Sequence, residues 1–223
     1  MSTQPCKGTP SADGTICAVN HDPGVSEQQI QHLAEQAARE RAALIDYLGN
    51  DVGPITVIVR DKGNARHKPP ATIFIPSRQI AKRYAITAHE ITHFLTQGWA
   101  SLVLKEGLAV YVQFHLGEQQ GWPNYRRSVH AAARHWIEND ATAIRSPTDA
   151  EAALQGRRKG QRQKLLATYS VSGSWVMWLL EKKFSGDIQR FLTTLYRSGD
   201  YRVALNERDT DLYVQWRAYL NSR

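Results

Sequence analysis

The sequence predicts an α+β fold in which a small N-terminal sheet is followed by a mostly helical half. Three observations support this prediction. Two short β-branched segments lie between residues 55 and 75, and longer stretches with helical spacing of apolar residues follow them. A hydrophobic content of 42% in 223 residues is enough for a globular core. Disordered and fibrous classes are therefore excluded.

The N-terminal segment, residues 1–25, is rich in Gly, Pro, Ser, Thr and Asp and is expected to be irregular. It contains both cysteines of the chain, Cys6 and Cys17. A disulfide between them would close the segment and indicate an oxidising compartment, whereas the alternative is a pair of free thiols in a loose tail. We expect an extracytoplasmic or secreted protein, although the chain begins without a secretory signal. Residues 26–223 are expected to form a single domain.

Caps, turns and spacing place the elements in order. Ser26 and Gln29 make a capping box, which begins a helix that ends at Gly49. Strands are expected from Ile55 to Arg60 and from Ala71 to Ile75, and the prolines at both ends of the second favour an edge position. Further helices are expected over residues 77–97, 101–116, 125–139, 147–154, 165–184, 187–197 and 212–220. No apolar run reaches the roughly 18–20 residues that a membrane-spanning helix requires.

The expected helix after the second strand contains the motif His89-Glu90-Ile91-Thr92-His93, an HExxH sequence. Two histidines four residues apart lie on one helix face and can bind one metal ion, while Glu90 can reach a water on that ion. Chance would supply only about 0.01 such motifs in a chain of this composition. The alternative is that these histidines are ordinary core or surface residues.

A hydrolytic zinc site needs a third protein ligand, and Glu106 on the next helix is the candidate. A tight turn at Gly98 would bring this helix back, and Gly107 would let it approach the first helix closely. His115 and Glu118 remain as alternative third ligands.

HEITH at 89–93 followed by KEGLAVY at 105–111 resembles the gluzincin zinc metallopeptidases, the peptidase-MA-like group. The resemblance covers about residues 55–220. It implies a zincin-like fold, one Zn²⁺ held by His89, His93 and Glu106, and hydrolysis of a peptide or protein substrate with Glu90 as general base. It also implies an edge strand beside the cleft that pairs with the substrate, which we assign to residues 71–75.

The resemblance further implies a tyrosine that stabilises the oxyanion of the reaction, and we assign this role to Tyr169. The alternative for Tyr169 is packing against a nearby tryptophan. Tyr111 is the other tyrosine to consider, and a supporting or core role fits it better. The tryptophans 175, 178 and 216 have core-like spacing.

The net charge is +7, and residues 81–164 carry 12 basic against 7 acidic side chains. Much of this excess lies in the stretch GRRKGQRQK, residues 156–164, which is typical of a solvated loop. A basic nucleic-acid binder is the third-ranked alternative, and the chain has no recognisable nucleic-acid motif to support it. The second-ranked alternative is a binding or scaffold module stabilised by zinc.

Overall fold

The computed structural model of the protein describes residues 5–96, 98, 101–119, 123–139, 142–156, 162–198 and 201–222, with the side chains of 196–198 and 201 excepted. It has the α+β fold that the sequence predicts. The chain groups into two compact units. The first unit comprises Met1–Gln97 and Leu116–Gly121, and the second comprises Gly98–His115 and Trp122–Arg223. The single domain expected over residues 26–223 stays a prediction.

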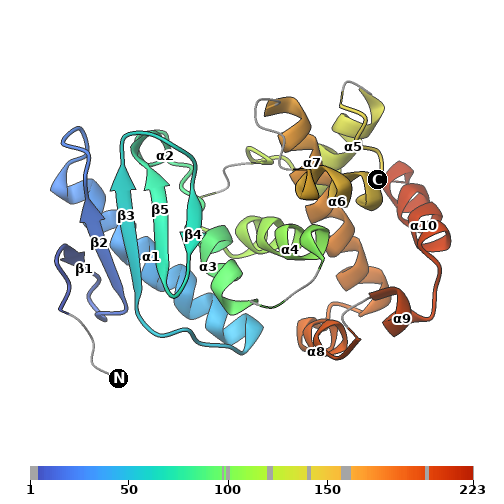
Figure 1. Ribbon diagram of the computed structural model, residues 1–223, viewed down its shortest axis with the longest axis horizontal. Coiled ribbons are helices and arrows are strands. Elements are labelled where there is room, and N and C mark those ends of the chain that lie inside the picture. The colour runs from blue at the N-terminus through green and yellow to red at the C-terminus, as the bar shows by residue number, and fades with distance from the viewer. Residues whose placement is uncertain are drawn as a thin grey trace. The chain divides into compact units, whose positions relative to one another are not determined.

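The first unit contains a five-stranded mixed sheet with the strand order β1-β2-β3-β5-β4 (Figure 1). Its strands are β1 (Thr9–Pro10), β2 (Ile16–Asn20), β3 (Ile55–Arg60), β4 (Arg66–Lys68) and β5 (Thr72–Pro76). β2, β3 and β5 are parallel, whereas β1 and β4 pair antiparallel at the two ends of the sheet. In β3 and β5, every second residue from Ile55 and Ile73 is buried, so one sheet face forms core.

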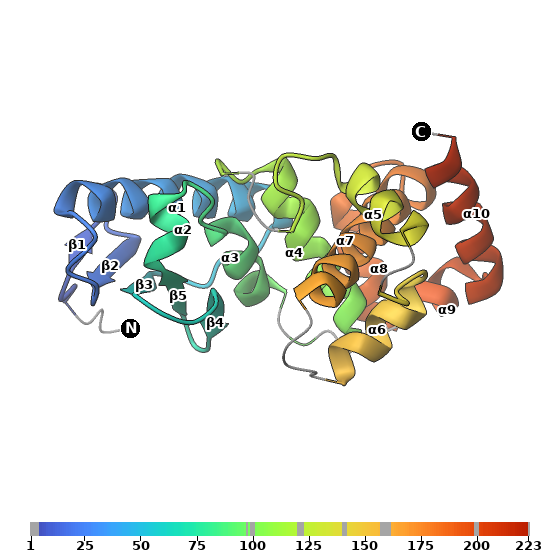
Figure 2. The same cartoon turned by 90° about the horizontal axis from the view of Figure 1, so that it is seen from above.

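Helix α1 (Glu27–Leu48) runs along the sheet and packs against β2 (Figure 2). The predicted capping box is present, since Ser26 accepts from the backbone of Gln29 and the Gln29 side chain accepts in return. Gly49 ends the helix in the left-handed conformation, with φ 77°. Both predicted ends of this helix are therefore confirmed.

Two predictions about the sheet are wrong. The segment expected to be irregular contains β1 and β2, and β2 pairs along its whole length with β3. The strand expected at the edge, β5, lies inside the sheet between β3 and β4. Pro69 and Pro70 belong to the turn before β5 and leave its ladder free to accept β4 as a partner, so β4 is the edge strand.

The helix expected over residues 77–97 is divided into α2 (Ser77–Ala81) and α3 (Thr87–Leu95). The break follows from Arg83, which has a positive φ of 52°, and from the backbone of Ala85, which donates to the side chain of Gln119 instead of to a helical carbonyl. As a result, the HExxH motif occupies a short helix of its own.

The second unit is helical in its described part. Its elements are α4 (Leu102–His115), α5 (Val129–Glu138), α6 (Pro147–Gln155), α7 (Arg162–Trp178), the π-helical turn η1 (Leu179–Lys183), α8 (Ile188–Ser198), α9 (Tyr201–Leu205) and α10 (Asp209–Asn221). α5 begins later than expected because Tyr125 and Arg126 have positive φ and Ser128 caps the helix. The sequence did not predict α9.

α4 and α7 pack closely through two glycines. A Cβ on Gly107 would lie 2.3 Å from the carbonyl oxygen of Ser172, and one on Gly173 would lie 2.4 Å from Cγ1 of Val110. The close approach that the missing side chain of Gly107 allows is therefore made by α7. The tryptophans 175, 178 and 216 are fully buried and in ring contact, which confirms their core role.

Cys6 and Cys17 form the predicted disulfide. Because Cys17 lies in β2, the bridge ties the chain before β1 to the sheet. Among the described residues, none of the helices combines the length and the apolar character needed to span a bilayer.

Candidate metal centre

The HExxH motif lies on α3, and every residue of this helix is buried. His89, Glu90 and His93 are exposed by only 3%, 4% and 2%. Ionisable side chains are seldom this buried unless they are paired or bind a metal. The three side chains are thus buried together on one short helix, and their action at one site stays a prediction.

The two histidines have the geometry of a zinc-binding pair. Their Nε2 atoms lie 3.3 Å apart, and their rings are nearly perpendicular, at 88°. Two nitrogens that bind one zinc ion at about 2.0–2.1 Å and a tetrahedral angle lie about 3.3–3.4 Å from each other. At this distance one of the two nitrogens can also donate a hydrogen bond to the other. The Nε2 atoms of His89 and His93 can therefore bind one zinc ion without a change in the helix.

The structure adds one residue that the sequence analysis missed. His67 on β4 lies with Nδ1 3.5 Å from Oε2 of Glu90, and its ring centroid lies 4.4 Å from that of His93. The ligand atoms of His67, Glu90 and His93 fall within 4.8 Å of one another. The signal in the sequence is weak, because a three-residue strand has no periodicity and RHK reads as a polar loop.

A buried polar network holds the start of α3. Glu40 on α1 accepts a hydrogen bond from the hydroxyl of Thr87, and also from the side chain of Gln36 at 3.0 Å and from the backbone of Glu118 at 2.9 Å. Burial raises the pKa of Glu40 to about 7, although these hydrogen bonds act in the opposite direction. The network fixes α3 two residues before His89.

Glu106 lies on α4, in the second unit, and is half-buried. The first turn of α4 is held by Glu151 on α6, whose carboxylate accepts from the backbone N–H of Val103 at 2.6 Å and of Leu102 at 3.2 Å. A carboxylate at a helix N-terminus satisfies free N–H groups and opposes the helix dipole. The helix that carries Glu106 is therefore well anchored within its unit. The ligand role of Glu106 stays a prediction.

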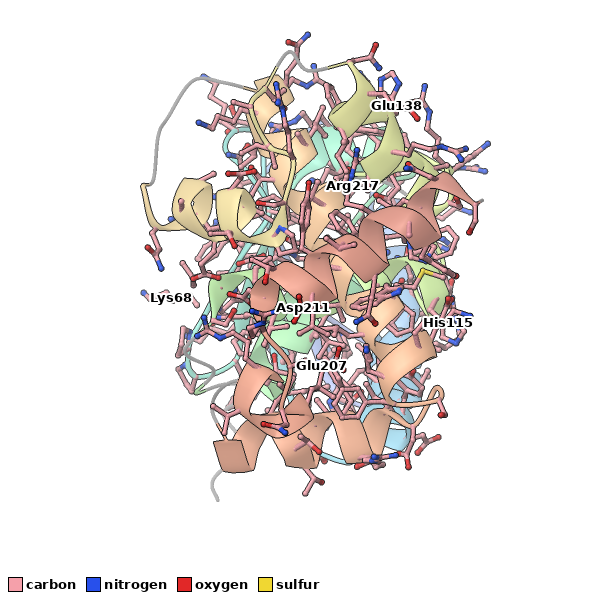
Figure 3. All side chains as sticks on the ribbon, turned by 90° about the vertical axis from the view of Figure 1, so that its right-hand side faces the viewer. Lys68, His115, Glu138, Glu207, Asp211 and Arg217 are labelled. Atoms are coloured by element: carbon pink, nitrogen blue, oxygen red, sulfur yellow. A yellow bond between two sulfur atoms is a disulfide. The ribbon has the colours of Figure 1, made fainter. Side chains whose placement is uncertain are left out.

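The two alternative third ligands, His115 and Glu118, each contact a side chain outside α3. His115 is exposed at the last residue of α4 (Figure 3). Its ring stacks on that of Tyr111, with ring centroids 5.4 Å apart. Glu118 forms a two-pronged ion pair with Arg39, at 2.6 and 2.9 Å. Tyr111 packs against an exposed histidine, and the supporting or core role expected of it stays a prediction.

Tyr169 lies on α7 and is half-buried. Ser172, whose carbonyl oxygen lies beside Gly107, follows Tyr169 by three residues. Residues three apart lie on the same face of a helix, so Tyr169 and Ser172 share one face of α7. Its role at the oxyanion stays a prediction. The core of the basic run, residues 157–161, lies outside the described residues.

Comparisons of this chain with protein-family models, with curated proteins and with solved structures found no match.

Proposed function

We propose that the protein is a zinc-dependent peptidase that hydrolyses peptide bonds with a water activated at the metal and Glu90 as general base. The observation that carries this proposal is the 3.3 Å separation of the His89 and His93 Nε2 atoms, which matches one edge of a zinc tetrahedron. A structural site would not need Glu90, which is no part of that pair. Its burial beside both histidines supports a catalytic role.

The side chains of α3 have two roles in the proposed reaction, metal binding and proton transfer. His89 and His93 would hold the ion. Zinc, when bound, lowers the pKa of a water towards about 7 and polarises a carbonyl group. Glu90 accepts the proton of the attacking water and passes it to the departing amine. Because the carboxylate is buried, it meets little competing bulk water while it holds that proton.

The proposal assigns the third ligand to Glu106 and the oxyanion donor to Tyr169. Both assignments rest on the resemblance of KEGLAVY at 105–111 and of the downstream helices to gluzincins. The anchoring of α4 by Glu151 supports the first assignment, since a metal ligand must be held in place.

The substrate would bind as an extended peptide along β4. β4 ends the sheet on the side of α3, so its outer edge can pair with a peptide backbone. This role replaces the one expected for residues 71–75. The disulfide between Cys6 and Cys17 supports an extracytoplasmic site of action.

The test combines zinc content with cleavage. The Glu90→Gln variant should bind zinc like the parent, near one ion per chain, and lose cleavage of casein by at least about 100-fold. Products whose new N-termini appear in a whole lysate with the parent and not with Glu90→Gln would define the substrate. Cleavage by Glu90→Gln at the rate of the parent would refute the mechanism.

A further inference from the structure

His67 is the polar side chain of β4 that points towards α3. Along a strand, side chains alternate between the two faces. Arg66 and Lys68 are exposed, whereas His67 is half-buried and lies opposite Ile73, which is fully buried. The pleat of the strand therefore directs His67 to the face on which α3 packs.

The ring of His67 is held by two neighbours on α3. This ring is tilted by 39° to that of His93, with centroids 4.4 Å apart, and it makes an edge contact with Phe94 at 88°, with centroids 5.6 Å apart. Its Nδ1 faces Oε2 of Glu90 at 3.5 Å. The side chain of Glu90 is 5% exposed and that of His67 is 24% exposed, so the histidine is the more exposed member of the pair.

This arrangement suits a hydrogen-bond donor better than a metal ligand. An imidazole nitrogen binds a metal along a lone pair in the ring plane. The in-plane lone pairs of His89 and His93 can converge, because these rings are perpendicular. The ring planes of His67 and His93 differ by only 39°, so their in-plane lone pairs are closer to parallel than those of His89 and His93.

A general base needs one carboxylate oxygen held and the other left for the proton. A buried carboxylate is also costly unless a donor reaches it. The contact of 3.5 Å is longer than a formed hydrogen bond of about 2.7–3.2 Å, and catalytic hydrogen bonds commonly shorten only when the substrate is bound.

We propose that His67 is a positioning residue for Glu90: its Nδ1–H holds Oε2, which leaves the second oxygen of Glu90 to take the proton of the attacking water. This inference rests on the proposed function and deepens it. It makes β4 a part of the catalytic site as well as the expected substrate edge.

Three replacements of His67 separate this role from packing. In His67→Asn the amide nitrogen takes the place of Nδ1, whereas in His67→Gln it takes the place of Nε2. We expect kcat to fall about 10–100-fold in His67→Ala and His67→Gln, to stay within about threefold of the parent in His67→Asn, and KM to change little. Zinc content should be unchanged in all three. His32→Ala, an exposed histidine on α1, is the matched control.

The second measurement needs neither zinc nor substrate. In a long-range ¹H–¹⁵N spectrum of the metal-free protein, His67 should carry its proton on Nδ1, and it should lose this preference in Glu90→Ala. Zinc loss in His67→Ala would make His67 a ligand and overturn the proposal. Full activity in His67→Ala, or a proton on Nε2 in the parent, would also overturn it.

These outcomes are distinct from failure of the peptidase proposal. If Glu90→Gln is as active as the parent, the peptidase mechanism is wrong whatever His67 does. If Glu90→Gln is inactive and His67→Ala is fully active, only the positioning role is wrong. If the parent cleaves nothing, the tautomer of His67 still decides whether it donates to Glu90.

Discussion

The carboxylate of Glu40 accepts a hydrogen bond from the hydroxyl of Thr87, and this contact joins α1 to the first residue of the HExxH helix. Glu40 is 1% exposed and Thr87 is fully buried. The helix that carries the candidate metal ligands is thus anchored by a group whose charge depends on pH.

Glu40 gives the first prediction. Burial raises its pKa from the ordinary value of 4.5 to about 7, so the folded protein binds more protons than the unfolded chain between these values. The folded state favours the protonated carboxyl of Glu40. Its contribution to the free energy of unfolding is therefore complete below about pH 4.5, decreases as the pH rises, and is lost above about pH 7. The loss amounts to about 3 kcal/mol. Glu40→Gln should remove this decrease.

The measurement is the free energy of unfolding by urea at pH 5 and at pH 8. The difference between the two values should be smaller in Glu40→Gln than in the parent. Glu27→Gln, at an exposed position of the same helix, should behave like the parent. Equal pH dependence of the parent and of Glu40→Gln would contradict the prediction.

Gly107 gives the second prediction. An added Cβ would lie 2.3 Å from the Ser172 carbonyl oxygen and 2.6 Å from Cγ2 of Val176, and the backbone oxygen cannot turn aside. Gly107→Ala should therefore destabilise the protein by about 1–3 kcal/mol. The control is Gly156→Ala at the end of α6, where the backbone is α-helical and the change should stay within about 1 kcal/mol. Equal melting temperatures of the two variants would show that α4 and α7 can separate at no cost.

Capping residues, turn residues and short sequence patterns correctly predicted the elements that depend mainly on neighbouring residues in the chain. The capping box at Ser26, the left-handed Gly49, and Ser146 with Pro147 at the start of α6 all mark helix ends, and the structure confirms them. β3 was predicted at its observed bounds because a short β-branched run between two turns is sufficient. The spacing of the HExxH residues likewise requires only one helix.

The elements that were missed depend on distant partners. β2 is five residues long and is stable because β3 pairs with it, whereas its Gly- and Pro-rich surroundings favour a loop. β4 exists because the turn at Pro69 returns the chain to β5. His67 and Glu40 join the site through these tertiary contacts, which leave no pattern in the sequence.

Glu151 gives the third prediction. Its carboxylate accepts from the backbone N–H groups of Leu102 and Val103 and from the hydroxyl of Ser101. Glu151→Ala leaves these donors without their acceptor, and should cost about 1–2 kcal/mol of stability. Glu151→Gln keeps one carbonyl oxygen and should lose less.

Thermal melting followed by circular dichroism measures whether Glu151→Ala loses more stability than Glu151→Gln. The control is Glu138→Ala, at the exposed end of α5 (Figure 3). If Glu106 is the third ligand, Glu151→Ala should also weaken zinc binding, since α4 would be less well held. A loss of stability in Glu138→Ala as large as in Glu151→Ala would count against a capping role.

Removal of zinc gives the fourth prediction, and it separates a catalytic site from a structural one. The cores are formed by the sheet with α1 and by the buried tryptophans, so the metal-free protein should keep its circular dichroism spectrum and lose hydrolysis. Free zinc at 100 times its Kd should add about 2.7 kcal/mol to stability. That gain corresponds to a rise in Tm of about 5–10 °C. Glu90→Gln should show the same rise as the parent, because it keeps both histidines, whereas His93→Ala should show none. Unfolding of the parent on chelation would instead identify zinc as the support of a binding module.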